Sequence, residues 1–194
     1  EAMLLCGGQI NRIGSIENGT TISDYHPGEK IRQISIHATP MFLEWKEKKI
    51  NVIDAPGYMD FIGEALSSLS IADMALVVVH AVNGIEVGTE QMWAHATKQG
   101  IPKVLVVNGL DREHTKFDEI LASARSRFGN NVFPMQLPIS AGPGFTQVLD
   151  VLSKNVFTHQ NDSSGKYTEK PAEGDLVEIV EKLHEELIEF VAES

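Results

Sequence analysis

The chain has little cysteine, few aromatic residues, no long hydrophobic run and a shortage of positive charge. Its single cysteine, Cys6, excludes a disulfide framework and a cysteine-rich zinc site, which fits a reducing compartment. The longest apolar run, Met74 to Val79, has the length of a strand and falls far below the roughly 18 residues of a membrane span. The N-terminus shows no signal pattern. We therefore expect a cytoplasmic protein without a membrane partner, with Cys6 as a buried thiol.

The 194 residues include 16 Lys and Arg against 27 Asp and Glu, which gives a formal net charge of −11. A field of this sign does not attract a nucleic-acid backbone, so we expect no direct sequence-specific nucleic-acid binding by this chain. Hydrophobic residues make up 42% of the chain. That fraction is enough for the core of one domain, or of one domain that carries a subdomain.

Apolar segments rich in β-branched residues alternate with helical patterns over the first two thirds of the chain. We expect strands at 51–53, 74–79 and 103–107, and helices at 61–71, 87–99 and 116–128. Because these strands are apolar at consecutive positions, they resemble parallel strands buried on both faces. The alternation predicts an α/β fold with a mostly parallel, doubly wound sheet, in which ligands bind at the carboxyl ends of the strands. A longer strand over 34–45 is expected to pair antiparallel with 49–53 through a charged turn.

The character of the sequence changes after about Pro138. Residues 145–156 suggest one or two strands, 160–165 an exposed turn, and 176–192 an amphipathic helix whose apolar positions recur every three or four residues. We interpret 139–194 as an insertion or subdomain. Residues 1–6 read as the second half of a helix closed by Gly7 and Gly8, and the last helix runs to the end of the chain, so we expect a fragment of a longer protein.

Polar residues that can bind a phosphate and a metal follow the first buried strand. Asp54, at the strand end, can hold a magnesium ion through a water molecule, and the backbone N–H of Gly57 can approach a terminal phosphate. Ser35, about twenty residues earlier, offers a hydroxyl that can reach the same ion. The pattern Asp-x-x-Gly is also common in ordinary strand-to-helix turns, so the motif alone leaves both interpretations open.

A second polar motif follows the third buried strand. The carboxylate of Asp111 can accept two hydrogen bonds from the N1–H and the amine of guanine, whereas adenine lacks both donors, and Asn108 can brace the neighbouring loops. An Asn- and Gly-containing turn is the plain alternative. Together, the two motifs follow buried strands in the order that a GTP-binding domain requires. For His80, at the end of the second strand, we expect a core or surface position rather than a metal ligand.

These motifs resemble the translational GTPases, and within them elongation factor G, nearly end to end. The matching segments are Ser23-Asp24-Tyr25 to Ile36, Ile53-Asp54-Ala55-Pro56-Gly57 with Asp60-Phe61, Ala81 to Glu86 with Thr89-Glu90, and Pro134 to Ile139 with Phe145 and Val148 to Val151. The resemblance implies a P-loop NTPase-like G domain over 1–138 and part of an inserted α+β subdomain over 139–194. It also implies that the phosphate loop lies before Glu1, that the Ser-Ala loop lies beyond Ser194, and that Ser140-Ala141 is the entry to the subdomain.

The resemblance implies roles for particular residues. Ser35 and Asp54 would hold Mg2+, Asp54 through water; Gly57 would sense the terminal phosphate; Asn108 and Asp111 would bind the guanine of GTP or GDP. Tyr58 would occupy the place of the residue that positions the attacking water. The implied partner of the whole protein is the ribosome, including the stalk of its large subunit, and we expect a monomer.

The sequence departs from the family at four positions. Tyr58 replaces a histidine, as in a second, divergent branch of elongation factor G; Gly109 replaces the lysine of Asn-Lys-x-Asp; Gln33 and Ser35 replace glycine and threonine. A tyrosine carries no positive charge, although its hydroxyl can still orient a water. Three alternatives therefore stay open: an active translational GTPase, a ribosome-binding module that holds GTP without hydrolysing it, and a nucleotide-free pseudo-GTPase. We expect GTPase activity in the full-length protein and none in this chain alone.

Overall fold

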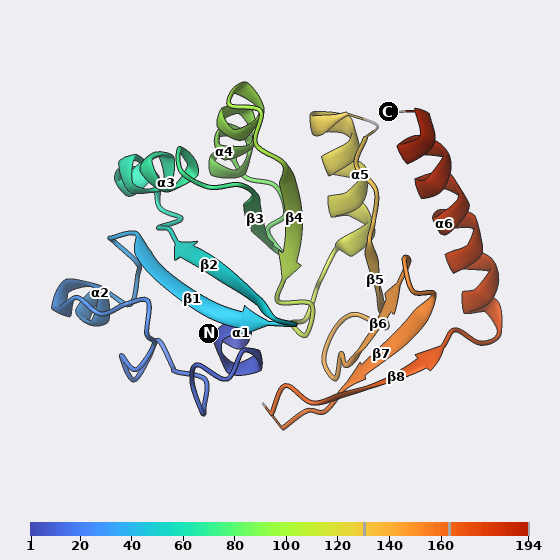
Figure 1. The fold of residues 1–194 in the computed structure, drawn as a ribbon, viewed down its shortest axis with the longest axis horizontal. Coiled ribbons are helices and arrows are strands. Elements are labelled where there is room, and N and C mark those ends of the chain that lie inside the picture. The colour runs from blue at the N-terminus through green and yellow to red at the C-terminus, as the bar shows by residue number, and fades with distance from the viewer. Residues whose placement is uncertain (130, 163, 194) are drawn as a thin grey trace. The chain divides into compact units, whose positions relative to one another are not determined.

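The structure is a computed structural model that describes residues 1–129, 131–162 and 164–193. Helices and strands alternate over residues 48–139, after which further strands follow one another up to the last helix (Figure 1). The elements are, in order, α1 (Ala2–Cys6), α2 (Pro27–Arg32), β1 (Thr39–Trp45), β2 (Lys48–Asp54), the 3-10 helix η1 (Met59–Phe61), α3 (Ile62–Leu69), β3 (Ala75–His80), α4 (Val87–Lys98), β4 (Lys103–Asn108), α5 (Phe117–Phe128), β5 (Gln136–Ile139), β6 (Gln147–Asp150), β7 (Asn155–His159), β8 (Tyr167–Pro171) and α6 (Asp175–Glu193).

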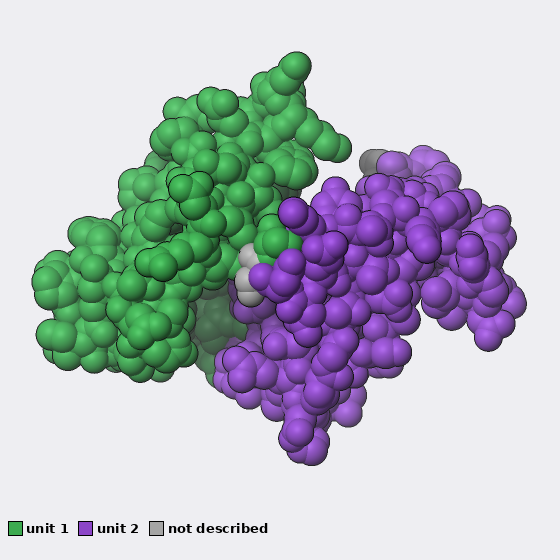
Figure 2. All heavy atoms as spheres, turned by 90° about the horizontal axis from the view of Figure 1, so that it is seen from below, with its two compact units in different colours: residues 1–77, 87–104, 163–165 green, residues 78–86, 105–162, 166–194 purple. Residues whose placement is uncertain are grey.

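The chain forms two compact units, coloured separately in Figure 2. Unit 1 comprises residues 1–77, 87–104 and 163–165, and unit 2 comprises residues 78–86, 105–162 and 166–194. The division falls within β3 and β4, so each of these strands contributes residues to both units.

An antiparallel hairpin of β1 and β2 is the main sheet element of unit 1. Thr39 is paired with Asp54 at one end and Trp45 with Lys48 at the other. The turn residues Lys46 and Glu47 both have positive φ, 47° and 61°, as a tight two-residue hairpin requires. The expected pairing across this charged turn is confirmed.

The strand expected over 34–45 starts only at Thr39, so its first part was predicted wrongly. The N–H groups of Ile36 and His37 donate to Glu29, and that of Ala38 donates to Glu64. Because these donors are bound by side chains, they do not join a strand ladder.

Strands β3 and β4 form a parallel pair. The N–H of Ala75 donates to the carbonyl oxygen of Pro102, and the N–H of Ala81 donates to that of Asn108. In both bonds the acceptor follows the donor by the same number of residues, as in a parallel pair. The expectation that these strands are buried on both faces is wrong. Val77 and Val79 are 9% and 3% exposed, whereas the alternate residues Leu76, Val78, Val104 and Val106 are 37–60% exposed.

The helices lie close to the predicted positions. The segment expected as one helix over 61–71 begins as η1 and continues as α3, while α4 and α5 match their expected ranges within two residues. In α5, Ile120 and Ala124 lie four residues apart and are buried, and the helix ends before Gly129, whose φ is +101°. α1 ends at Gly7, as predicted, but Cys6 is exposed rather than buried, because it lies on the outward side of this single turn and a half.

Unit 2 contains a four-stranded antiparallel sheet in the order β5-β6-β7-β8, with α6 beside it (Figure 1). The core between them is centred on Leu149, Val151 and Val180, which are at most 1% exposed. His184 Nδ1 lies 2.9 Å from the carbonyl oxygen of Val151 and ties α6 to the end of β6. The strands expected over 145–156 and the last amphipathic helix are confirmed as β6, β7 and α6, while β5 and β8 were not predicted.

Two further expectations concern an exposed turn and the absence of a membrane span. The turn expected at 160–165 includes residue 163, which lies outside the described residues; the neighbouring Gln160 N–H donates to Lys166. Across the described ranges, no helix combines the length and the apolar character needed to cross a membrane.

Candidate functional site

The loop after β2 carries three of the predicted site residues. Asp54 is the last residue of β2 and is half-buried, whereas Gly57 and Tyr58 are exposed. The carbonyl oxygen of Tyr58 accepts the N–H of Phe61 at 3.0 Å, and this bond starts η1. A Cβ built on Gly57 would meet no atom within 4 Å, and its φ is not in the left-handed region. The described residues therefore do not themselves require glycine at position 57.

Ser35 is held by a buried carboxylate. Its hydroxyl donates to Asp24 Oδ1 at 2.7 Å, and the other oxygen of Asp24 accepts the hydroxyl of Thr21 at 3.1 Å. Asp24 is only 7% exposed. Because Ser35 uses its hydroxyl proton in its bond to Asp24, the lone pairs of its oxygen remain available to a cation. In the described part of unit 1, the structure records no hydrogen bond between Ser35 and Asp54.

Glu29 fixes the path of the backbone around Ser35. It is completely buried, and its carboxylate accepts N–H groups of His26 at 2.8 Å, Ile36 at 3.0 Å and His37 at 2.9 Å. Burial raises the pKa of this carboxyl, but the hydrogen bonds from His37, Ile36 and His26, together with the nearby imidazole of His37, outweigh that effect and lower the pKa below its ordinary value. The ionised form of Glu29 therefore organises the segment from His26 to His37.

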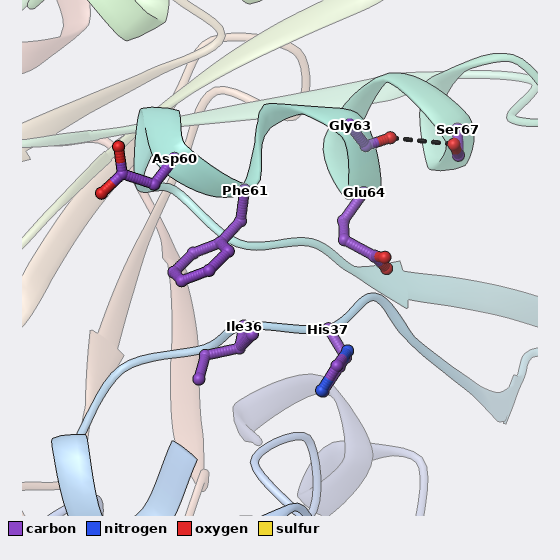
Figure 3. Close-up of a pocket in the computed structure, with 7 residues that line it drawn as sticks. All are labelled: Ile36, His37, Asp60, Phe61, Gly63, Glu64 and Ser67. Carbon is purple, nitrogen blue, oxygen red and sulfur yellow. Dashed lines mark hydrogen bonds between the residues drawn. The ribbon is translucent and has the colours of Figure 1, made fainter. Parts of the chain in front are cut away.

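The same segment is linked to η1 and α3 across an open pocket of about 430 Å3 (Figure 3). On one side lie Ile36 and His37; on the other, the ring of Phe61 is directed towards Ile36 and the carboxylate of Glu64 towards His37. Glu64 Oε2 also accepts the N–H of Ala38 at 2.8 Å. This hydrogen bond connects residues 36–38 to α3.

The second polar loop, in unit 2, follows β4. Asn108 and Asp111 are exposed, and Gly109 between them has a φ of +81°. Backbone hydrogen bonds hold the loop: the N–H of Arg112 donates to Gly109 at 3.1 Å, and the N–H of Gly142 donates to Leu110 at 2.7 Å. Sequence reasoning missed the contribution of Gly142, for which the Gly- and Pro-rich run after Ile139 was the available signal.

The predicted site residues thus lie in three segments, of which the one before β1 holds Ser35. Asp54, Gly57 and Tyr58 share one loop of unit 1, and Asn108 and Asp111 share one loop of unit 2. Among the described residues there is no cluster of three or more His, Cys, Asp or Glu side chains that could hold a metal. The candidate magnesium ligands are instead a hydroxyl and a carboxylate, and oxygen donors of this kind suit Mg2+, which usually keeps several of its waters.

The parallel pair β3 and β4 is combined with helices α4 and α5, with an Asp-Ala-Pro-Gly loop after β2 and with an Asn-Gly-Leu-Asp loop after β4. This is the arrangement of a G domain of the P-loop NTPase class. Residues 1–193 match the family described as the elongation factor Tu GTP binding domain. The chain belongs to this family. The end-to-end resemblance to translational GTPases is confirmed.

Individual relatives agree with this assignment. The chain is 33% identical over 192 residues to elongation factor G of Mycoplasma genitalium, covering 99% of this chain and 28% of that protein. It is 34% identical over 207 residues to the mitochondrial ribosome-releasing factor 2 of Debaryomyces hansenii, covering 100% of this chain and 24% of that protein. A crystal structure from Thermus thermophilus matches with a TM-score of 0.88 and 33% identity, over 97% of this chain and 28% of that one. The chain thus spans about a quarter of the length of these relatives.

Proposed function

We propose that this chain is the guanine-nucleotide-binding part of an elongation factor G-like protein, which couples GTP hydrolysis to translocation or to another remodelling step on the ribosome. The observation that carries the proposal is the pair of polar loops at the ends of β2 and β4, in a chain that matches the GTP-binding family over residues 1–193. The names of the relatives, elongation factor G and ribosome-releasing factor 2, support a role on the ribosome.

In this proposal Asp111 reads the base. Its exposed carboxylate accepts hydrogen bonds from the N1–H and the exocyclic amine of guanine, and adenine offers neither donor. Hydrogen bonds to a charged acceptor discriminate strongly, because a mismatched base leaves the carboxylate unpaired. Asn108 braces the loop beside it.

The loop after β2 and the segment around Ser35 bind the phosphates and Mg2+. The open space around Gly57 lets an oxygen of the terminal phosphate reach its backbone N–H. Ser35 would hold Mg2+ through its hydroxyl and Asp54 through a water molecule; the ion, when bound, neutralises charge on the phosphate oxygens. The chemistry of this donor set fits Mg2+.

Tyr58 takes the water-positioning role. Its side chain is 59% exposed and lies next to Gly57, so its hydroxyl is free to hydrogen-bond to a water near the terminal phosphate. Because a tyrosine supplies no positive charge, we expect slow hydrolysis. Loss of the terminal phosphate would release the contacts of Gly57 and Ser35 and relax both segments.

We further propose that the G domain spans 1–138 as a mostly parallel, doubly wound sheet and that 139–194 belong to an inserted α+β subdomain, which β6 to β8 and α6 support. The whole protein would act as a cytoplasmic monomer, with the ribosome and the stalk of its large subunit as partners.

Replacing Asp111 with Asn tests the proposed base reader. An amide presents a donor to the guanine amine, so the Asp111→Asn variant of the full-length protein should lose affinity for GTP and gain affinity for XTP, whose carbonyl accepts that donor. Competition between the two nucleotides measures the shift. Asp118→Asn, at an exposed carboxylate on α5, is the matched control and should leave the preference unchanged. An unchanged GTP/XTP ratio in Asp111→Asn would remove Asp111 from the base site.

A further inference from the structure

His80 ends β3 directly beside the loop that follows β4. The N–H of Ala81, the next residue, donates to the carbonyl oxygen of Asn108 at 2.8 Å, which aligns the ends of the two strands. The carbonyl oxygen of His80 itself accepts the N–H of Gly84 at 2.8 Å and closes the following turn. The backbone of His80 is thus fixed on both sides, at the edge of the sheet where α/β proteins bind their ligands.

The imidazole of His80 lies over Gly109. A Cβ built on Gly109 would be 3.4 Å from His80 Nε2 and 3.7 Å from His80 Cδ2. The ring therefore occupies the side of residue 109 from which a side chain would project. Because Gly109 has no side chain, the ring is the nearest side-chain group at this point of the loop, together with the Cγ of Arg112 at 3.7 Å.

One hydrogen bond sets the orientation of the ring. Nδ1 accepts the N–H of Val82 at 3.2 Å, so in the neutral imidazole the proton is carried by Nε2. Within the described ranges the structure records no other hydrogen bond of this side chain. His80 is exposed, and its ring is thus held in place without being covered.

We propose that His80 is an additional nucleotide-binding residue, whose imidazole packs against the purine ring of the guanine nucleotide held by Asn108 and Asp111. The inference rests on the proposed function, because it assumes that this loop reads the base. A flat, exposed aromatic ring that is already oriented loses little conformational freedom on contact, and bases stack readily on such rings. The bare backbone of Gly109 leaves the ring room to take this position.

The test is the affinity of the full-length protein for fluorescent GDP in magnesium buffer. Three variants separate ring packing from hydrogen bonding: His80→Ala removes both, His80→Asn keeps a polar group without a ring, and His80→Phe keeps a ring without a donor. His80→Ala and His80→Asn should each weaken GDP binding about tenfold, and His80→Phe should stay near the wild type. His159→Ala, at another exposed histidine of unit 2, is the matched control and should bind like the wild type.

The outcomes keep the two proposals apart. If the wild type binds GDP and Asp111→Asn shifts the base preference while His80→Ala binds GDP normally, the role of His80 is overturned and the proposed function stands. If His80→Asn binds normally and His80→Phe does not, ring packing is overturned. If the wild-type protein binds neither GDP nor GTP, the proposed function fails and this inference fails with it.

A spectroscopic measurement covers the case in which a variant folds poorly. In the wild-type protein, the imidazole signals of His80 should shift when GDP is added, whereas those of His159 should not. A His80 resonance that stays in place at saturating GDP would contradict the contact, whatever the variants do.

Discussion

Glu29 shows at the scale of one residue how charge shapes the segment that carries Ser35. A completely buried carboxylate is costly unless hydrogen bonds satisfy it, and here backbone N–H groups from both ends of the segment do so. The hydroxyl of Ser35 is placed by a second buried carboxylate, Asp24. The position of the proposed magnesium ligand thus depends on two acidic side chains with structural roles.

Glu29→Gln should destabilise this segment by about 1–3 kcal/mol. The reason is that one carboxylate oxygen, which accepts a backbone N–H, is replaced by an NH2 group, which is itself a donor. Hydrogen exchange of the Ile36 and His37 amides measures the effect, and Glu44→Gln, at an exposed carboxylate on β1, is the control. The folded-state pKa of Glu29 lies below its ordinary value of 4.5. Its stabilisation is therefore present above about pH 4.5 and is lost as the pH falls through the folded-state value. Equal amide protection in variant and wild type at pH 7 would contradict this role.

In the proposed function, the side chain at position 58 determines the rate of GTP hydrolysis. Tyr58→His introduces a side chain that can carry positive charge next to the water it positions, so ribosome-stimulated GTP hydrolysis should increase. The rise should be seen in kcat with little change in GDP affinity, because Tyr58 does not contact the base. Tyr25→His, at another exposed tyrosine of unit 1, is the control. No gain in hydrolysis would mean that position 58 is not catalytic.

At the scale of elements, long periodic segments were predictable and short or polar ones were not. The apolar spacing of α6 and the range of α5 follow from sequence because apolar residues recur at helical intervals in both. β8 is exposed along its whole length and carries no apolar alternation, so its pairing with β7 decides its structure. The late start of β1 depends on the side chains of Glu29 and Glu64, which are 7 and 26 residues away from the N–H groups that they accept.

The packing of β6 against α6 gives a test at this scale. Leu149 is 1% exposed in the core of unit 2, and Leu149→Ala should lower the free energy of unfolding by about 2–5 kcal/mol through lost burial and the cavity left behind. Urea denaturation measures the loss. Leu152→Ala removes the same atoms from a side chain that is 55% exposed and should cost far less. Similar losses for both variants would show that β6 and α6 do not form the core of unit 2.

At the scale of the whole molecule, the sequence identified the two polar loops but not what surrounds them. Asp54, Gly57, Asn108 and Asp111 could be singled out because strand-end motifs are local. The contacts of His80 with Gly109 and of Gly142 with Leu110 join residues about 30 apart in the chain, so no local pattern announces them. The exposed face of β3 and β4 was missed for a related reason, since an apolar run does not reveal what covers it.

The proposed function requires that the loops after β2 and β4 bind a guanine nucleotide. The most direct test is a titration of the full-length protein with fluorescent GDP and GTP in magnesium, with ATP as the competitor. We expect saturable binding that unlabelled GDP displaces and ATP does not. Absence of binding, or displacement by ATP as readily as by GDP, would contradict it.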